Sequence, residues 1–360
     1  MKYSIIVPVF NRPDEVDELL ESLTRQTCRD FEVVIVEDGS EVRCEEVVRR
    51  YADQLDIHYF EKPNSGPGQS RNYGAERSQG EFLIVLDSDV VLPEGYLAEV
   101  DKELEANPCD AFGGPDRAHE SFTPVQKAIN YSMTSFFTTG GIRGGKKKLD
   151  KFYPRSFNMG IRRTLYQQLG GFSNMRFGED IDFSIRIFKS GNRCRLFPEA
   201  WVWHKRRTDF RKFFRQVHNS GIARINLYKK YPESLKLVHL LPTVFTVGVI
   251  GCMLLFLLGI AMFCYGEWLD ANGLRPTDNM HQGVGFVFCV LALLPILLYC
   301  LLIFIDSSIR NHSLWVGILS IPASFIQLLG YGTGFLRAWW LRCVCGRNEE
   351  LQAFRKTFYK

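Results

Sequence analysis

The sequence predicts an α/β fold with a mostly parallel sheet, followed by a membrane-associated helical region. Within residues 1–235, short continuous apolar runs alternate with amphipathic segments, which is typical of buried parallel strands joined by helices. Residues 236–341 are instead dominated by apolar runs long enough to cross a bilayer. We therefore expect a catalytic or binding domain at 1–235, a membrane region at 236–341 and a basic tail at 342–360.

The first predicted strand is the apolar run at residues 4–9, which ends just before Asn11 and Arg12. Pro13 then begins a predicted helix, because proline fits the first helical turn and Asp14 interacts favourably with the positive end of the helix dipole. This turn lacks the GxGxxG pattern that holds the pyrophosphate of a dinucleotide, so the sequence disfavours a Rossmann dehydrogenase.

Three more strands are predicted at residues 31–36, 57–61 and 82–86, with helices at residues 47–55 and after the loop 63–69. In such sheets, ligands bind beyond the carboxyl ends of the strands. Polar clusters follow three of these ends: Asn11-Arg12, Glu37-Asp38 and Asp87-Ser88-Asp89. The sequence therefore predicts a ligand site at this edge of the sheet.

Asp87 and Asp89 are the candidate metal ligands. They are one residue apart directly after a buried strand, so both carboxylates can bind the same hard cation. Mg²⁺ and Mn²⁺ prefer such oxygen ligands and commonly share them with substrate phosphates. His204, which follows a short aromatic run, is a candidate third metal ligand or diphosphate contact, and a structural histidine is the alternative.

Two other motifs have both a chemical and a structural interpretation. Arg71 follows a glycine-rich loop at a helix start, where it could pair with a diphosphate or remain a solvated surface side chain. Glu179 and Asp180 also begin a helix, where they serve either as a general base or as an acidic helix start. On that helix we expect Asp182 on the polar face. The basic segment 140–148 is interpreted either as a lid or as an uninvolved loop.

Residues 237–265 and 284–305 each exceed the roughly 20 apolar residues that cross a bilayer core. A third run, 314–336, contains a proline, a glutamine and several glycines, and whether it crosses is left open. Many basic residues precede the first span, whereas the loop 266–283 holds only Arg275. By the positive-inside rule, the domain at 1–235 is expected in the cytoplasm, on a multi-pass protein of the inner or plasma membrane.

Composition and charge argue against other classes of protein. The formal net charge of +4 is too small to suggest a partner nucleic acid. The ten cysteines are scattered, so neither a disulfide framework nor a CxxC zinc site is expected. The first strand follows Met1 and Lys2 directly, without the apolar region of a signal peptide.

The motifs, in this order, resemble glycosyltransferase family two, the inverting enzymes with a GT-A fold. The matching pieces span about residues 3–225: Ser4-Ile5-Ile6-Val7-Pro8-Val9-Phe10-Asn11, Val33-Val34-Ile35-Val36-Glu37-Asp38-Gly39-Ser40, Gly66-Pro67-Gly68-Gln69-Ser70-Arg71-Asn72, Asp87-Ser88-Asp89, Phe157-Asn158-Met159-Gly160, Gly170-Gly171-Phe172 and Gly178-Glu179-Asp180. Each piece is modest alone, and the ordered set is specific.

The resemblance implies roles for these residues. The nucleotide-sugar would be bound by Pro8, Asn11, Glu37, Asp38, Arg71, Asp87 and Ser88. The metal, Mg²⁺ or Mn²⁺, would be bound by Asp89 and Asp87. Asp180 would be the catalytic base with Glu179 beside it, and Asn158 would border the acceptor pocket.

The function implied is inverting, metal-dependent transfer of a single sugar from a nucleotide-sugar, with a UDP-sugar favoured, to a lipid-linked or membrane-proximal glycan. Processive family members carry a QxxRW motif on a membrane-proximal helix, and the stretch 213–221 lacks it, which favours one sugar per encounter. Transfer onto polyprenyl phosphate is an alternative. A catalytically silent membrane scaffold that binds nucleotide-sugar is an alternative of another class.

Overall fold

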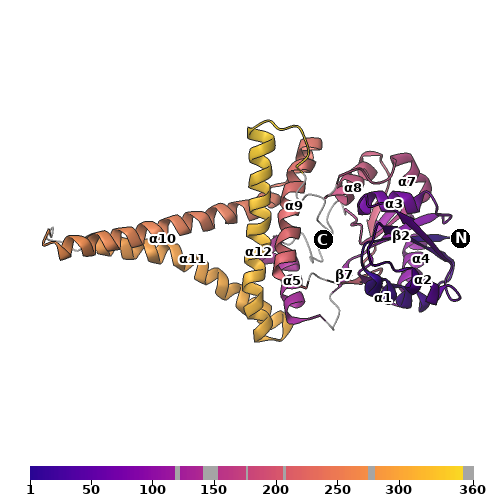
Figure 1. Ribbon diagram of the computed structural model, residues 1–360, viewed down its shortest axis with the longest axis horizontal. Coiled ribbons are helices and arrows are strands. Elements are labelled where there is room, and N and C mark those ends of the chain that lie inside the picture. The colour runs from indigo at the N-terminus through magenta and orange to yellow at the C-terminus, as the bar shows by residue number, and fades with distance from the viewer. Residues whose placement is uncertain (118–121, 141–152, 176, 206–207, 275–279, 352–360) are drawn as a thin grey trace. The chain divides into compact units, whose positions relative to one another are not determined.

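The computed structural model describes residues 1–117, 122–140, 153–175, 177–205, 208–274 and 280–351 (Figure 1). The chain divides into two compact units. The first is built mainly from Met1–Phe122 and Lys146–Arg206, and the second from Thr123–Gly145 and Arg207–Ala353. The chain therefore enters the second unit twice. Residues 141–148 of the predicted lid segment lie outside the described residues.

A seven-stranded sheet forms the centre of the first unit, in the order β3-β2-β1-β4-β8-β6-β9. Strands β1 to β4 are mutually parallel where they pair, while β8 runs antiparallel to both β4 and β6. The strands are β1 (Tyr3–Val9), β2 (Phe31–Asp38), β3 (Ile57–Lys62), β4 (Phe82–Leu86), β6 (Ala111–Gly113), β8 (Asn158–Arg162) and β9 (Cys194–Leu196). The predicted parallel core is confirmed, although β2 continues through Glu37 and Asp38, which were expected to stop it.

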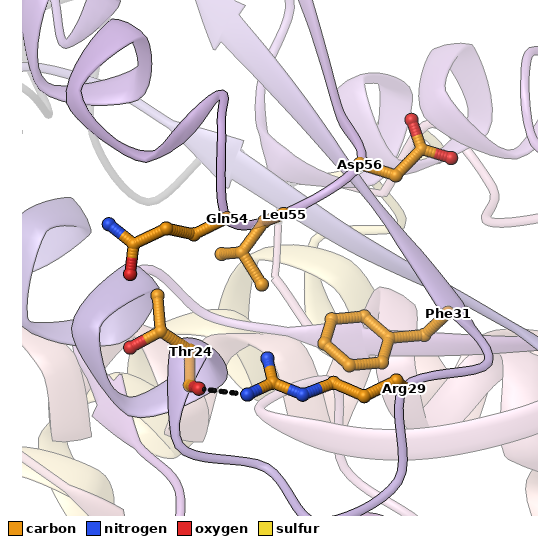
Figure 2. Close-up of a pocket in the computed structure, with 6 residues that line it drawn as sticks. All are labelled: Thr24, Arg29, Phe31, Gln54, Leu55 and Asp56. Carbon is orange, nitrogen blue, oxygen red and sulfur yellow. Dashed lines mark hydrogen bonds between the residues drawn. The ribbon is translucent and has the colours of Figure 1, made fainter.

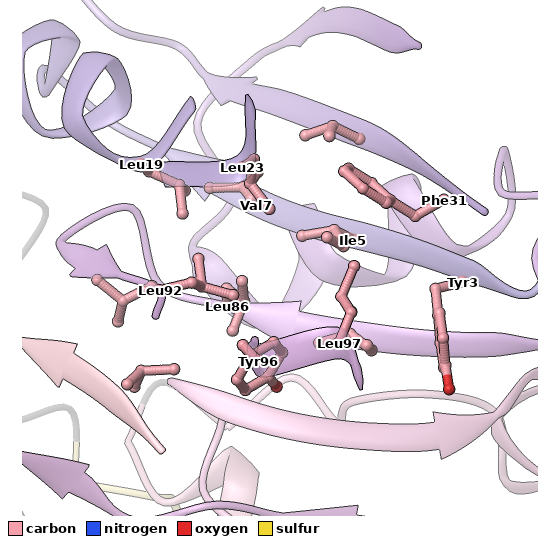
Figure 3. Packing of buried hydrophobic residues seen from close by; sticks show 14 of the residues in the cluster. Tyr3, Ile5, Val7, Leu19, Leu23, Phe31, Leu86, Leu92, Tyr96 and Leu97 are labelled. Atoms are coloured by element: carbon pink, nitrogen blue, oxygen red, sulfur yellow. The ribbon is translucent and has the colours of Figure 1, made fainter. Parts of the chain in front are cut away.

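Both faces of this sheet are covered, because successive side chains of a strand point to opposite faces. Ile5 and Val7 of β1 pack in one core cluster, and Ile6 between them packs in the other. Figure 3 shows the first cluster, in which Leu19 and Leu23 meet β1. The helices of the first unit are α1 (Pro13–Thr24), α2 (Glu45–Tyr51), α3 (Pro67–Ala75), α4 (Tyr96–Ala106), α7 (Arg163–Leu169) and α8 (Glu179–Lys189).

One prediction about α8 is wrong. Asp182 was expected on a polar face, but its side chain is fully buried, together with Phe183 and Ile187 of the core. The burial is tolerated because Arg186, one turn later, donates to the Asp182 carboxylate at 3.0 Å. The Arg186 guanidinium also donates to two backbone carbonyls, so α8 is fixed to the loop before it.

A second, small sheet lies next to the end of β4. Its order is β5 (Val90–Val91), β10 (Val202–His204) and β7 (Asp116–Arg117). His204 pairs with Val90, the residue that follows Asp89. This pairing brings residues more than 100 positions apart to the same strand end.

The second unit is helical, with α5 (Pro124–Thr134), α6 (Phe136–Thr139), α9 (Phe210–Lys230), α10 (Leu241–Ala271), α11 (Met280–Asn311), α12 (Leu314–Trp339) and the short turns Pro232–Ser234, Leu237–Leu240 and Trp340–Val344. Among the residues that the structure describes, three helical stretches are long and apolar enough to cross a membrane: Leu237–Ala271, His281–Asn311 and Leu314–Val344. In the most apolar part of each stretch, 6% of the first and 11% of the second is buried within the protein, against 39% of the third.

Candidate active site

Asn11 joins the turns that follow β1 and β2. Its backbone has a φ of 54°, a left-handed conformation that asparagine tolerates better than most residues. The side-chain oxygen accepts from the backbone N–H groups of Glu41 and Val42 at 2.7 and 2.9 Å. Pro8 lies in β1 opposite Val36 of β2. These contacts hold the carboxyl ends of the two strands together.

Glu37 and Asp38 at the end of β2 are both buried and both fully engaged by neighbours. Asp38 accepts from the N–H groups of Ser65 and Gly66, each at 2.9 Å, and forms an ion pair with Lys62. The carboxylate therefore holds the glycine-rich loop that opens α3.

Glu37 accepts from the Cys44 N–H at 3.0 Å and from the Tyr59 hydroxyl at 3.2 Å. Burial and the nearby Glu37 carboxylate raise the pKa of the Cys44 thiol well above its usual range, which keeps it protonated. A cavity of about 370 Å³ opens beside these groups, lined by Glu37, Gly39, Ser40, Arg43, Glu61, Lys62 and Pro63.

Asp87, Asp89 and His204, the candidate metal ligands, lie together, with one potential ligand atom of each within 4.8 Å of the others. His204 Nε2 lies 3.2 Å from Asp89 Oδ1, and the ring stacks on Phe157 at 4.9 Å between centroids. On the other side of the ring, Asp116 Oδ2 lies 3.8 Å from His204 Nδ1. The two carboxylates suit Mg²⁺ or Mn²⁺, and the imidazole favours Mn²⁺ because Mg²⁺ prefers oxygen ligands, so the residues present fit a divalent cation.

Arg71 is the central cation of the site. Its side chain is only 3% exposed, so the solvated alternative is wrong. Nη2 donates to Asp87 Oδ1 at 2.7 Å and Nη1 to Glu179 Oε1 at 3.1 Å, while the guanidinium lies over the Phe172 ring at 5.2 Å. Arg71 therefore connects the carboxylate pair at the end of β4 to the acidic start of α8.

Glu179 and Asp180 have different surroundings although they are adjacent. Burial, together with the Asp180 charge, raises the pKa of Glu179 to about 7, although Arg71 opposes this shift. Asp180 Oδ2 lies 3.4 Å from Arg155 Nη1, and Oδ1 accepts from the Ile181 N–H at 2.8 Å. Asp180 is thus partly exposed and paired with a cation, next to a buried glutamate whose pKa is raised.

Asn158 and Ser88 are placed less favourably for direct contact with a ligand. Asn158 is fully buried; its amide oxygen accepts from the Tyr96 hydroxyl at 2.6 Å and its amide nitrogen donates to the Ala200 carbonyl at 2.9 Å. Ser88 is buried as well. These contacts give Asn158 a structural role, and its acceptor role stays a prediction.

Three side chains of the site received no role from the sequence: Arg12, Arg155 and Asp116. Arg12 Nη1 lies 3.3 Å from Asp89 Oδ2, although 77 positions separate the two residues. The only signal in the sequence for Arg12 was its place just after the first strand. No sequence motif marked Arg155 or Asp116 as a site residue. Both reach the site only because short strands and turns pair in the folded chain.

A further cavity, of about 490 Å³, is lined by Thr24, Arg29, Phe31, Gln54, Leu55 and Asp56 (Figure 2). It lies where β2 begins and just before β3, at the amino ends of these strands. None of the predicted site residues lines it.

Comparisons with known proteins agree with this geometry. The model of the family "Glycosyl transferase family 2" matches residues 4–170. An uncharacterized glycosyltransferase of Haemophilus influenzae is 33% identical over 52% of this chain and 62% of its own length. The probable glycosyltransferase YdaM of Bacillus subtilis is 25% identical over 94% of this chain and 80% of its own length. The chain spans less than two thirds of the length of the first curated relatives that it matches.

The mannosyltransferase PcManGT from Pyrobaculum calidifontis, solved in complex with GDP-Man and Mn²⁺, has a similar structure. The likeness has a TM-score of 0.53 at 16% identity and covers 95% of this chain and 88% of that one. This structural likeness and the mixed, mostly parallel sheet together confirm the predicted GT-A fold.

Proposed function

Through its residues 4–170 the chain belongs to glycosyl transferase family 2, and on that premise we propose that it transfers a single sugar from a nucleotide-sugar to an acceptor at the membrane. The observation that carries the proposal is the chain of contacts from His204 and Asp89 through Asp87 and Arg71 to Glu179. It joins a candidate cation site to Glu179, the neighbour of the proposed base Asp180, within one unit.

We assign donor binding to the carboxyl ends of β1, β2 and β3. The nucleotide would occupy the cavity beside Glu37, near Asp38, Pro8 and Asn11. Asp38 and Arg71 are held rigidly by their own partners, which favours a preformed site. A UDP-sugar is the favoured donor by family resemblance, and PcManGT, solved with GDP-Man, makes a GDP-sugar the second donor to test.

Asp87, Asp89 and His204 would hold a divalent cation, Mn²⁺ or Mg²⁺, which when bound neutralises charge on a departing diphosphate. Asp180 would accept the proton of an acceptor hydroxyl as that oxygen attacks the anomeric carbon from the face opposite the leaving group. A single displacement of this kind inverts the anomeric configuration. Glu179, whose pKa is raised to about 7, would lie beside this base.

The acceptor is proposed to be a lipid-linked or membrane-proximal glycan. Three helices of the second unit are apolar enough to cross a membrane, which supports a substrate that is itself held at the membrane. By the positive-inside rule the first unit would face the cytoplasm, where nucleotide-sugars are available.

Polyprenyl phosphate is the second candidate acceptor, and one contact favours it. Arg155 lies 3.4 Å from Asp180, so a guanidinium stands beside the proposed base. An anionic acceptor would pair with Arg155 and would need no base, because its oxygen is already a nucleophile. With this acceptor, replacement of Asp180 would cost little activity.

The proposal is tested with purified full-length protein in detergent and radiolabelled UDP- or GDP-sugars. We expect transfer that requires Mn²⁺ or Mg²⁺ and is lost in Asp89→Asn. With a hydroxyl acceptor, Asp180→Asn should lower the rate by roughly 10²–10⁴-fold, the usual scale for loss of a general base.

Asp53→Asn, an exposed aspartate of the same unit, is the matched control and should retain full activity. A protein that binds a nucleotide-sugar but neither transfers nor hydrolyses it would instead be the silent scaffold. Wild-type turnover in Asp89→Asn would exclude the cation site.

A further inference from the structure

Arg12 lies beside the proposed cation site and has a partner on each side. Its Nη1 atom is 3.3 Å from Asp89 Oδ2 and 3.1 Å from Glu15 Oε1. The side chain is 33% exposed, and Arg12 directly follows Asn11, whose contacts fix the backbone at the end of β1. The backbone of Arg12 is therefore held in place, whereas its guanidinium is partly exposed to solvent.

The two guanidiniums of the site differ in how firmly they are held. Arg71 is 3% exposed and bridges two carboxylates, Asp87 and Glu179, inside the protein. Arg12 is partly solvated and shares one nitrogen between its two partners. An ion pair of this partly exposed kind contributes little stability, so it can be exchanged at low cost.

Asp89 is the point where this exchange would take place. Its Oδ1 atom faces His204 and its Oδ2 atom faces Arg12. A cation bound to Asp89 and Arg12 therefore compete for the same carboxylate. A planar guanidinium released there is suited to phosphate, which it can bind through two parallel hydrogen bonds.

Resting on the proposed function, we propose that Arg12 is a diphosphate-binding residue that Asp89 holds in place until a divalent cation displaces it. Binding of the cation then frees Arg12 for the donor. Bound cation and bound diphosphate then each increase the affinity of the protein for the other. An arginine that did not pair with Asp89 would not couple the two affinities in this way.

The test measures binding and needs no turnover. Mn²⁺ binding to the full-length protein without nucleotide is followed by electron paramagnetic resonance, and UDP or GDP binding at saturating Mn²⁺ is followed by calorimetry. In Arg12→Gln we expect Mn²⁺ to bind roughly twofold to fivefold more tightly, because the competing guanidinium is gone. The same variant should bind the nucleoside diphosphate about tenfold more weakly, because a charge-assisted contact is lost.

Arg25→Gln is the matched control, since Arg25 ends the same helix, is 57% exposed and pairs with Glu21. It removes the same charge without touching Asp89 and should leave both affinities near wild type. Arg12→Lys keeps the positive charge but loses the paired N–H donors of the guanidinium. It should change both affinities in the same directions as Arg12→Gln by smaller factors, and it replaces Arg12→Gln in the test if that variant fails to fold.

Opposite changes of the two affinities support the proposal. Equal Mn²⁺ affinities in Arg12→Gln and Arg25→Gln, or an unchanged nucleotide affinity, would overturn it while leaving the proposed function intact. A wild-type protein that binds no Mn²⁺ would overturn both the metal-dependent function and this role of Arg12.

Discussion

At the scale of single residues, the site depends on charges that are buried in pairs. Arg71 takes its place in the core because Asp87 and Glu179 each accept one of its N–H groups. Removal of Arg71 would break its ion pair with the buried Glu179, and breaking a buried pair typically costs about 3–5 kcal/mol. Arg71 therefore has a structural role that any assay of its function must separate from binding.

Glu179 gives a prediction about pH. Its pKa is raised from 4.5 to about 7, so between these values the folded protein binds a proton that the unfolded chain does not. Stability contributed by this group is then present below about pH 4.5 and falls as the pH rises towards 7. The side chain of Glu179→Gln cannot titrate. The Tm of this variant minus the Tm of the wild type should therefore increase as the pH rises from 5 to 7.

Thermal melts in detergent with a chelator present would check this, since the chelator keeps cations from the neighbouring carboxylates. Glu103→Gln, outside the site on α4, should show no such trend. A difference in Tm that stays constant across this pH range would contradict the raised pKa of Glu179.

At the scale of elements, glycines determine how closely α9 and α12 approach. A Cβ at Gly334 would overlap the His218 carbonyl oxygen, and a Cβ at Gly221 would overlap the Tyr331 carbonyl oxygen. His218 Nδ1 also lies 3.2 Å from the Thr333 hydroxyl, across the same contact. Gly334, one of the glycines of the third apolar run, and Gly221 of α9 are thus positions that allow backbone-to-backbone packing of the two helices.

Gly334→Ala should therefore destabilise the second unit, by about 1–3 kcal/mol, because the backbone atoms that a methyl group meets cannot rotate away. Gly251→Ala in α10 is the matched control, because a Cβ there meets nothing within 4 Å. Urea or thermal unfolding followed by circular dichroism would compare the two. Equal stability of the two variants would mean that α9 and α12 do not pack at Gly334.

At the scale of the whole molecule, the open question is how many times the chain crosses the membrane. α10 and α11 form a hairpin, and α12 lies crosswise to it beside α9 (Figure 1). α9 carries basic side chains along its length, with Arg215 and Arg224 inside the helix as well as Arg211 and Lys229 near its ends. Basic side chains in the bilayer centre cost about 2.5–3.5 kcal/mol each, so α9 is unsuited to lie in hydrocarbon beside a spanning helix.

We therefore expect two crossings, by α10 and α11, with α12 lying along the membrane interface. This arrangement also explains why α12 is the most buried of the three apolar helices. Reporter fusions after residue 360 and before residue 1 should then report the same side of the membrane. A cytoplasmic signal from green fluorescent protein at both ends would agree, whereas alkaline phosphatase activity only at the carboxyl end would indicate three crossings.

By itself, the sequence determined the parallel strands, the carboxylates at their ends and the apolar helices, because each depends on a local pattern of apolar and polar residues. It could not place Asp182, which was predicted on a polar face but is buried, where it pairs with Arg186, a side chain that the carbonyls of Leu169 and Gly171 hold in place. Nor could it assign Arg12 to Asp89 or Arg155 to Asp180. Only the tertiary structure decided those contacts, because they join segments far apart in the chain, and the energy of an ion pair depends on distance and burial that no local pattern encodes.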